Sequence, residues 1–254
     1  VADVHSEPDN PVIGPRAYGT TPAQVSAALT EVLAGLRAAR VASCLKHFPG
    51  HGDTRTDSHL TLPVCEADRA TLEARELAPF RAHLDADTIM TAHLVARALD
   101  PERPATFSAA IVHTLLREQL GYTGVTVTDA LEMKGASGMR SEGDAGRLAL
   151  EAGVDLLLFA HFDEEVRRAR LEIARTVVEG DFDRTRFEQS RPRLAAFDAA
   201  SAAIRASSSP EQKEQRVFVR QWVQVYSPQL VHRAVQPLQI CLSQQSHQYL
   251  HSTQ

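Results

Sequence analysis

One stretch of the chain, residues 46–63, is rich in side chains that can move protons or bind metal. It reads K-H-F-P-G-H-G-D-T-R-T-D-S-H-L-T-L-P and holds three histidines, two aspartates, one lysine and one arginine. Asp57 and His59 are two residues apart, so the carboxylate can accept a hydrogen bond from one imidazole nitrogen and fix the tautomer of the ring. The other ring nitrogen can then exchange a proton with a substrate. This spacing predicts a general acid/base pair.

A metal site is the alternative interpretation of the same stretch. His47, His51, Asp53, Asp57 and His59 all have side chains that metals accept as ligands. Their spacing does not follow the H-E-x-x-H pattern of zinc sites on helices. The glycines at positions 50 and 52 also leave the chain flexible, whereas metal sites favour firm elements. We therefore expect no metal and no other cofactor, and a metal-dependent hydrolase stays open as an alternative.

The same glycines suggest how the acid/base pair could move. Pro49 supplies a stiff point, and Gly50 and Gly52 supply two hinges, so the sequence predicts a loop that closes over a substrate. For His51 and Asp53 we expect hydrogen bonds within the loop.

Further polar residues stand at the ends of short apolar segments that are expected to be strands. Lys46 and His47 end the first such segment, His93 ends the second and Asp129 ends the third. Active sites of (β/α)8 barrels are built at the carboxyl ends of the strands. A carboxylate in that place, such as Asp129, can act as a nucleophile or a base. The alternative for Asp129 is the N-cap of a following helix.

The hydrophobic pattern alternates between strands and helices along most of the chain. We expect strands at residues 40–46, 88–93, 125–129 and 154–159, and helices at residues 23–39, 72–84, 109–120, 146–152 and 164–179. Strands separated by helices imply parallel pairing. A doubly wound sheet and a (β/α)8 barrel both fit this α/β pattern, and the polar strand ends favour the barrel.

Composition limits the classes of partner. The chain has 254 residues and a formal net charge of −5, so we expect no nucleic-acid partner. No apolar run approaches the roughly 20 residues that span a bilayer, so we expect no membrane partner. Cys44, Cys65 and Cys241 are odd in number and favour free thiols in a reducing compartment. A cytoplasmic location is expected. Export stays open because the chain begins with Val1 and its true start is expected to be missing.

The character of the chain changes after about residue 206. Ser207-Ser-Ser-Pro210 is typical of a linker, and no glycine or aspartate follows it. We expect residues 1–206 to form one domain and residues 207–254 to be a loosely attached or disordered tail without an assigned role. An apolar alternation at residues 217–225 fits a strand or a short helix.

Several motifs together resemble glycoside hydrolase family 3. The loop motif K-H-F-P-G-H-G-D-T with D-S-H-L-T-L-P is the most specific of them. The others are N-P-V-I-G-P-R-A-Y-G at 10–19, M-T-A-H at 90–93, P-A-T-F-S at 104–108, L-L-R-E-Q-L-G at 115–121 and T-D-A-L-E-M at 128–133. The set looks most like the β-N-acetylglucosaminidase branch, and the resemblance covers residues 1–206.

This resemblance implies a role for each matching residue. Asp129 matches the catalytic nucleophile, and His59 matches the general acid/base with Asp57 as its partner. The matching residues that would bind the sugar are Lys46, His47 and Arg16, and His93 matches a position near the site. The implied reaction is retaining hydrolysis of terminal β-linked N-acetylglucosamine from peptidoglycan fragments or similar glycans, through a covalent glycosyl-enzyme intermediate. The implied partner is therefore a carbohydrate.

One departure from the family pattern affects the expected fold. A full barrel needs eight strands, and residues 1–4 resemble only the end of the fourth. The first three strands are therefore expected to be missing, which would leave exposed strand edges and an uncovered apolar interior. We expect such a part-barrel to fold poorly or aggregate. A β-glucosidase of the same family and an inactive sugar-binding fragment stay open as alternatives.

Overall fold

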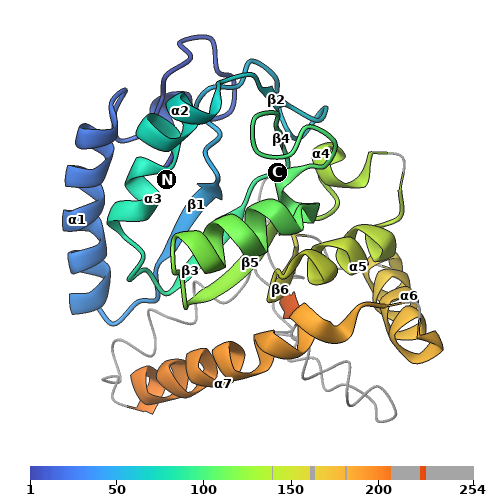
Figure 1. The fold of residues 1–254 in the computed structure, drawn as a ribbon. Helices are drawn as coiled ribbons and strands as arrows, with labels where there is room; N and C mark the ends of the chain where they lie inside the picture. The colour runs from blue at the N-terminus through green and yellow to red at the C-terminus, as the bar shows by residue number, and fades with distance from the viewer. Residues whose placement is uncertain (139, 161–163, 181, 207–223, 227–254) are drawn as a thin grey trace, which may run out of the picture.

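The computed structural model describes residues 1–138, 140–160, 164–180, 182–206 and 224–226, and a mainly parallel sheet forms its centre (Figure 1). The strands of this sheet, in spatial order, are β1 (Cys44–Phe48), β3 (Thr88–Thr91), β5 (Val125–Ala130), β6 (Leu156–Phe159) and β7 (Gln224–Tyr226). The first four run parallel, and β7 pairs with β6 in the antiparallel direction. All four predicted strands are confirmed, with boundaries shifted by a few residues.

A second, small sheet lies near the loop of interest. It consists of β2 (Val64–Cys65) and β4 (Val95–Ala96), which pair in parallel. The sequence analysis did not predict these strands, because two residues are too few to show a periodic pattern. The predicted alternation at residues 217–225 lies outside the described residues except for the first part of β7.

Helices surround the main sheet (Figure 1). They are α1 (Pro22–Ala38), α2 (Arg69–Thr71), η2 (Leu72–Glu76), α3 (Ala78–Ala82), η4 (Ala110–Gln119), α4 (Lys134–Ser137), α5 (Glu142–Ala152), α6 (Glu164–Glu179) and α7 (Arg184–Ala206), with 3-10 turns η1 (Gly14–Arg16) and η3 (Ala105–Phe107). The predicted helices at 23–39, 109–120 and 164–179 are confirmed, although η4 is π-helical. Within the described residues, no helix is long and apolar enough to cross a membrane.

Helix α1 shows why these segments fold as they do. Its first turn is closed by a capping box, in which the Thr21 hydroxyl accepts from the backbone of Gln24 and the Gln24 side chain accepts from Thr21. Val25, Leu29 and Leu33 follow at intervals of four and are all buried. Helical spacing therefore puts three apolar side chains on one face, and that face belongs to the core cluster that also includes Leu45 and Ile89 of the sheet.

The sheet is not closed into a barrel within the described residues. Strand order runs from β1 to β7 without a return contact to β1. The expectation of a (β/α)8 barrel is therefore met only in its coarser part, a parallel α/β sheet. The expectation of an uncovered interior is wrong where helix α7 packs against the sheet. Leu194 of α7 is buried against Val125, Val127 and Leu156, and Phe197 of the same helix packs against this cluster.

The outer edges of the sheet are also less exposed than expected. At one edge β7 pairs with β6. At the other, the Ala2 N–H donates to the carbonyl of Lys46 in β1 at 2.7 Å. Residues 2–4 are fully buried, but they are not part of a regular strand. The N-terminal segment thus covers the edge of β1, which satisfies backbone groups that would otherwise invite another chain.

Glu76 of helix η2 lies under this N-terminal segment and is fully buried. Its Oε1 accepts hydrogen bonds from Ser6 Oγ at 3.2 Å and from Arg75 Nε at 2.6 Å. Its Oε2 has no hydrogen-bond partner among the described residues. Burial raises the pKa of Glu76 to about 7, although Arg75 acts in the opposite direction.

This raised pKa predicts a pH-dependent contribution to stability. Folded Glu76 keeps a proton that the unfolded chain has already released, so stability falls as pH rises from about 4.5 through about 7. Glu76→Gln should remove this decline, and the free energy of unfolding should be measured by denaturant titration between pH 5 and 8. The matched control is Glu73→Gln, which changes a half-exposed carboxylate of the same helix. Parallel pH profiles for the parent and Glu76→Gln would contradict the assignment.

Candidate active site

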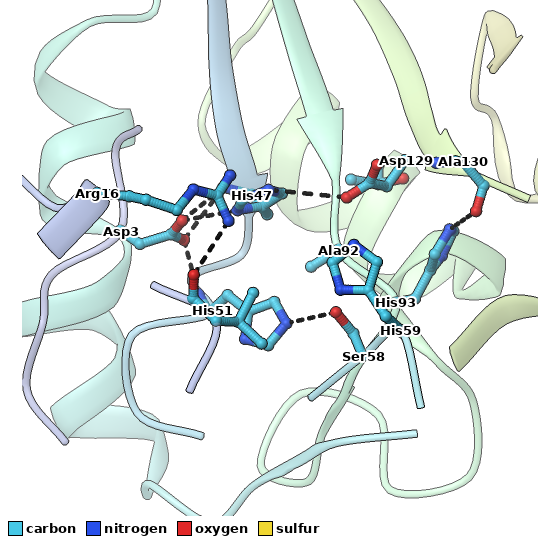
Figure 2. A network of polar contacts seen from close by, with 12 residues as sticks. Asp3, Arg16, His47, His51, Ser58, His59, Ala92, His93, Asp129 and Ala130 are labelled. Atoms are coloured by element: carbon cyan, nitrogen blue, oxygen red, sulfur yellow. Dashed lines mark hydrogen bonds and ion pairs between the residues drawn. The ribbon is translucent and has the colours of Figure 1, made fainter. Parts of the chain in front are cut away.

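The carboxyl ends of β1 and β5 bring two ionisable side chains together. Asp129, near the end of β5, places Oδ2 at 3.7 Å from Nε2 of His47 in β1 (Figure 2). The Asp129 side chain is 22% exposed, so solvent or a ligand can reach it. Its Oδ1 accepts from the backbone N–H of Ala130 at 2.8 Å, which fixes the orientation of the carboxylate. The sequence analysis places both residues at strand ends, and in the structure their side chains lie next to each other.

The other side of His47 is bound to a residue that the sequence analysis missed. The Asp3 carboxylate is fully buried and lies 2.7 Å from Nδ1 of His47. It also accepts from the backbone N–H groups of His47 at 3.0 Å and His51 at 2.8 Å. Burial alone would raise the pKa of Asp3, but the charge and hydrogen bonds of His47, together with the charge of His51, hold it below its usual value. Asp3 is therefore ionised.

His93 supports the strand end and has no free ring nitrogen. It is 1% exposed, and its Nε2 donates to the carbonyl of Ala130 at 3.1 Å, since a carbonyl can only accept. Its Nδ1 lies 2.9 Å from the Thr106 hydroxyl. That hydroxyl donates its proton to the Ala92 carbonyl at 2.9 Å. Burial lowers the pKa of His93, opposed by the charge of Asp129. His93 thus holds the backbone beside Asp129.

Asp57 and His59 form the hydrogen-bonded pair that their spacing predicts. Asp57 Oδ1 accepts from the backbone N–H of His59 at 2.8 Å and lies 2.7 Å from its Nδ1. Burial alone would raise the pKa of Asp57, but the hydrogen bonds and charge of His59 lower it, so the carboxylate is ionised and Nδ1 donates. The His59 side chain is 60% exposed. Its Nε2 is therefore available to an incoming molecule.

The segment that carries this pair is fastened to the helix after β5. Ser58 lies between Asp57 and His59, and its carbonyl accepts from the backbone N–H of Gly135 in α4 at 2.9 Å. A Cβ at Gly135 would lie 3.0 Å from both the Ser58 carbonyl and His93, so only glycine fits without a shift. Figure 2 shows Ser58, His59 and His93 in the same region as Asp129. The Asp57–His59 pair is thus tied to the segment that follows Asp129.

Two glycines in the loop before Ser58 lie in tightly packed surroundings. Gly50 has a φ of 122°, and a Cβ there would lie 2.7 Å from the Cβ of Glu76. A Cβ at Gly52 would lie 1.6 Å from the carbonyl oxygen of Val4. Both glycines therefore permit close packing against the N-terminal segment and η2, and their role as hinges stays a prediction.

The second histidine of the loop, His51, forms its hydrogen bonds within the loop. His51 is buried, with Nδ1 at 2.7 Å from Thr54 Oγ1 and Nε2 at 3.1 Å from Ser58 Oγ, as expected for loop-internal bonding. Burial lowers the pKa of His51. Asp53 instead pairs with Arg75 of η2 at 2.7 Å, outside the loop. Within the described residues, no group of three or more His, Cys, Asp or Glu side chains is arranged to hold a metal.

The remaining predicted sugar-binding residues are less buried than His47. Arg16 is exposed in η1, and its Nη1 donates to the Val12 carbonyl at 3.1 Å. Lys46 is half-buried in β1. Asn10, which opens the motif containing Arg16, is buried and donates to the His51 carbonyl at 2.8 Å. The segment of residues 10–16 is thus tied to the loop, although no direct contact joins Arg16 to Asp129 or His59.

Comparison with solved structures finds the same fold in a related enzyme. The structure of a glycoside hydrolase family 3 β-N-acetylglucosaminidase from Paenibacillus sp. str. FPU-7 matches with a TM-score of 0.77 and 41% sequence identity. The match covers 82% of this chain and 40% of that one.

Comparison with curated protein sequences finds similar β-hexosaminidases. A β-hexosaminidase A of Pseudoalteromonas piscicida is 44% identical over 170 residues, or 61% of this chain and 28% of that protein. A β-hexosaminidase of Methylococcus capsulatus is 37% identical over 188 residues, or 73% of this chain and 54% of that protein. The chain therefore spans about half or less of the length of these curated relatives.

The close packing around Gly135 leads to a prediction. Gly135→Ala should lower the free energy of unfolding by roughly 1–3 kcal/mol, because the new methyl group overpacks His93 and the Ser58 carbonyl. Gly35→Ala is the matched control, since Gly35 is exposed in α1 and its Cβ would meet nothing within 4 Å. That control should gain about 0.5–1 kcal/mol of helix stability. Equal effects of both variants in denaturant titrations would contradict the packing described.

The family model provides the broadest match. The model of the glycosyl hydrolase family 3 N-terminal domain matches residues 1–197, more than half of the chain. The family model and the related proteins show that the chain belongs to glycosyl hydrolase family 3.

Proposed function

We propose that this chain carries the catalytic site of a retaining exo-glycosidase that releases terminal β-linked N-acetylglucosamine from peptidoglycan-derived or similar glycans. The names of the related proteins, β-hexosaminidase and β-N-acetylglucosaminidase, support the substrate class. The observation that carries the proposal is that a partly exposed Asp129 carboxylate ends β5, while the helix after β5 is hydrogen-bonded to the segment that carries the solvent-facing Asp57–His59 pair.

In the first step, Asp129 acts as the nucleophile. One carboxylate oxygen attacks the anomeric carbon, and the bond from that carbon to the leaving oxygen breaks. His59, protonated on both ring nitrogens, gives its Nε2 proton to the leaving oxygen. The ionised Asp57 stabilises the imidazolium and keeps the other proton on Nδ1. The products are a glycosyl-enzyme ester at Asp129 and a free alcohol.

In the second step, the same histidine acts as the base. Neutral His59 takes a proton from water through Nε2 as the water oxygen attacks the anomeric carbon. The bond from that carbon to Asp129 breaks, and the carboxylate is restored together with an imidazolium. Two displacements at one carbon give retention of configuration. A histidine suits both steps because its ordinary pKa of about 6.5 lies near neutral pH.

The remaining parts of the proposal concern binding and organisation. Lys46, His47 and Arg16 would bind the sugar hydroxyls, and His93 would support the site through Ala130 rather than through a free ring nitrogen. Residues 1–206 would form the catalytic domain, and the role of 207–254 stays unassigned. The proposal requires no metal or cofactor. A cytoplasmic location is part of it, supported by the odd number of cysteines.

The roles of Asp129 and His59 predict different responses to the leaving group. Asp129→Ala should lower kcat/KM by about 1000-fold or more on both nitrophenyl and alkyl N-acetylglucosaminides, because the nucleophile is needed with either. His59→Ala should lose far less on the nitrophenyl substrate, since a good leaving group needs little protonation. Initial rates on the two substrates test this, and a nitrophenyl glucoside run in parallel checks for β-glucosidase activity. Activity of Asp129→Ala close to the parent would refute the proposal.

A further inference from the structure

Asp3 has an unusually complete set of partners for a residue outside the acid/base pair. Its two oxygens accept from the backbone N–H groups of His47 and His51 and from Nδ1 of His47, all within 3.2 Å. The carboxylate is fully buried and ionised, so it can only accept hydrogen bonds. The proton between Asp3 and His47 therefore belongs to Nδ1 of the histidine.

That proton assignment determines what His47 presents to Asp129. In the neutral ring Nδ1 carries the only proton, so Nε2 faces Asp129 Oδ2, 3.7 Å away, with a lone pair. Two acceptors that face each other repel, and a second proton on Nε2 removes that repulsion. The resulting imidazolium lies between two carboxylates, each of which stabilises it.

We propose that Asp3 is a positioning residue for Asp129, acting through His47. By holding the Nδ1 proton, Asp3 orients the imidazole so that an Nε2 proton points at the carboxylate of Asp129. This inference rests on the proposed function, because Asp129 regains its negative charge when the glycosyl-enzyme ester is hydrolysed. An Nε2–H donor aimed at the departing oxygen would stabilise that charge as it develops. Asp3 touches neither the sugar nor the reacting atoms.

A purely structural role for Asp3 is the alternative, since it also fixes two backbone N–H groups of the loop. Asp155 provides the comparison within the same chain. It is equally buried and accepts from the Thr126 N–H at 2.7 Å and from Arg117 at 2.6 Å. These contacts lie at the start of β5 and β6, at the opposite end of the strands from Asp129. Asp155→Asn should therefore destabilise the fold without affecting His47.

The test is Asp3→Asn with Asp155→Asn as its control. The asparagine amide can donate to Nδ1, so the neutral His47 ring should move its proton to Nε2. Two-dimensional ¹H–¹⁵N spectra of the histidine rings at pH 8 report which nitrogen carries the proton, and His47→Gln identifies the signal by its loss. We expect Nδ1 to be protonated in the parent and in Asp155→Asn, and Nε2 to be protonated in Asp3→Asn. In this variant His47 donates to Asp129 from a neutral ring and not from an imidazolium held between two carboxylates, so the kcat of Asp3→Asn should fall about ten- to a hundredfold, with a smaller change in KM.

Each outcome decides for or against the inference. An unchanged tautomer in folded Asp3→Asn, or an unchanged kcat with a changed tautomer, would overturn it. If Asp3→Asn does not fold, the parent spectrum alone decides, because a bare Nδ1 on neutral His47 contradicts the assignment and a protonated Nδ1 supports it. The ring spectra need no turnover, so a parent protein without glycosidase activity would refute the proposed function while leaving the role of Asp3 towards His47 measurable.

Discussion

Parallel alignment of β1, β3 and β5 is the constraint on which the site depends. Parallel strands end at the same edge of a sheet, so residues far apart in the sequence meet there. His47 and Asp129 are 82 positions apart, yet the pairing of β1 and β5 with the intervening β3 brings their side chains to 3.7 Å. His93 follows β3 and hydrogen-bonds to the backbone next to Asp129. The chemistry therefore depends on strand order more than on any local motif.

Two histidine–carboxylate pairs in the site are built in opposite environments. The His47–Asp3 pair is almost fully buried, where an unpaired charge is costly and each hydrogen bond is correspondingly important. The His59–Asp57 pair is largely exposed, and exposed ion pairs contribute little to stability, typically 0–1 kcal/mol. The buried pair thus suits a fixed, positioning part of the site, while the exposed pair suits exchange of protons with a substrate and water.

Local patterns were sufficient to predict the strand ends and the Asp57–His59 pair. Both depend on neighbouring residues, because an apolar strand followed by a polar residue and a two-residue spacing are visible in the sequence. Asp3 could not be found in this way, since its partners His47 and His51 lie more than 40 positions away and nothing near Asp3 indicates them. The packing of Gly52 against Val4 is equally non-local, so the sequence did not indicate it.

Helix α7 shows a different limit of sequence analysis. It contains Pro192, which usually interrupts a helix, and its many alanines and charged residues leave the apolar face weakly marked. The sequence analysis predicted no helix there, and it expected an uncovered interior because it took the first three strands of a barrel to be missing. Its buried Leu194 and the adjacent Phe197 pack against Val125 and Val127 of β5, the strand that carries Asp129. Tertiary packing rather than local propensity accounts for this helix.

The most direct test of the account is to identify the residue that becomes covalently bound to the sugar. The protein would be incubated with a fluorinated N-acetylglucosaminyl donor whose glycosyl-enzyme ester hydrolyses slowly, and the digested peptides would be mapped by mass spectrometry. We expect one added N-acetylglucosaminyl-type group, carried on the carboxylate of Asp129. A covalent adduct on any other residue, or hydrolysis of the donor with no adduct at Asp129, would contradict the central claim.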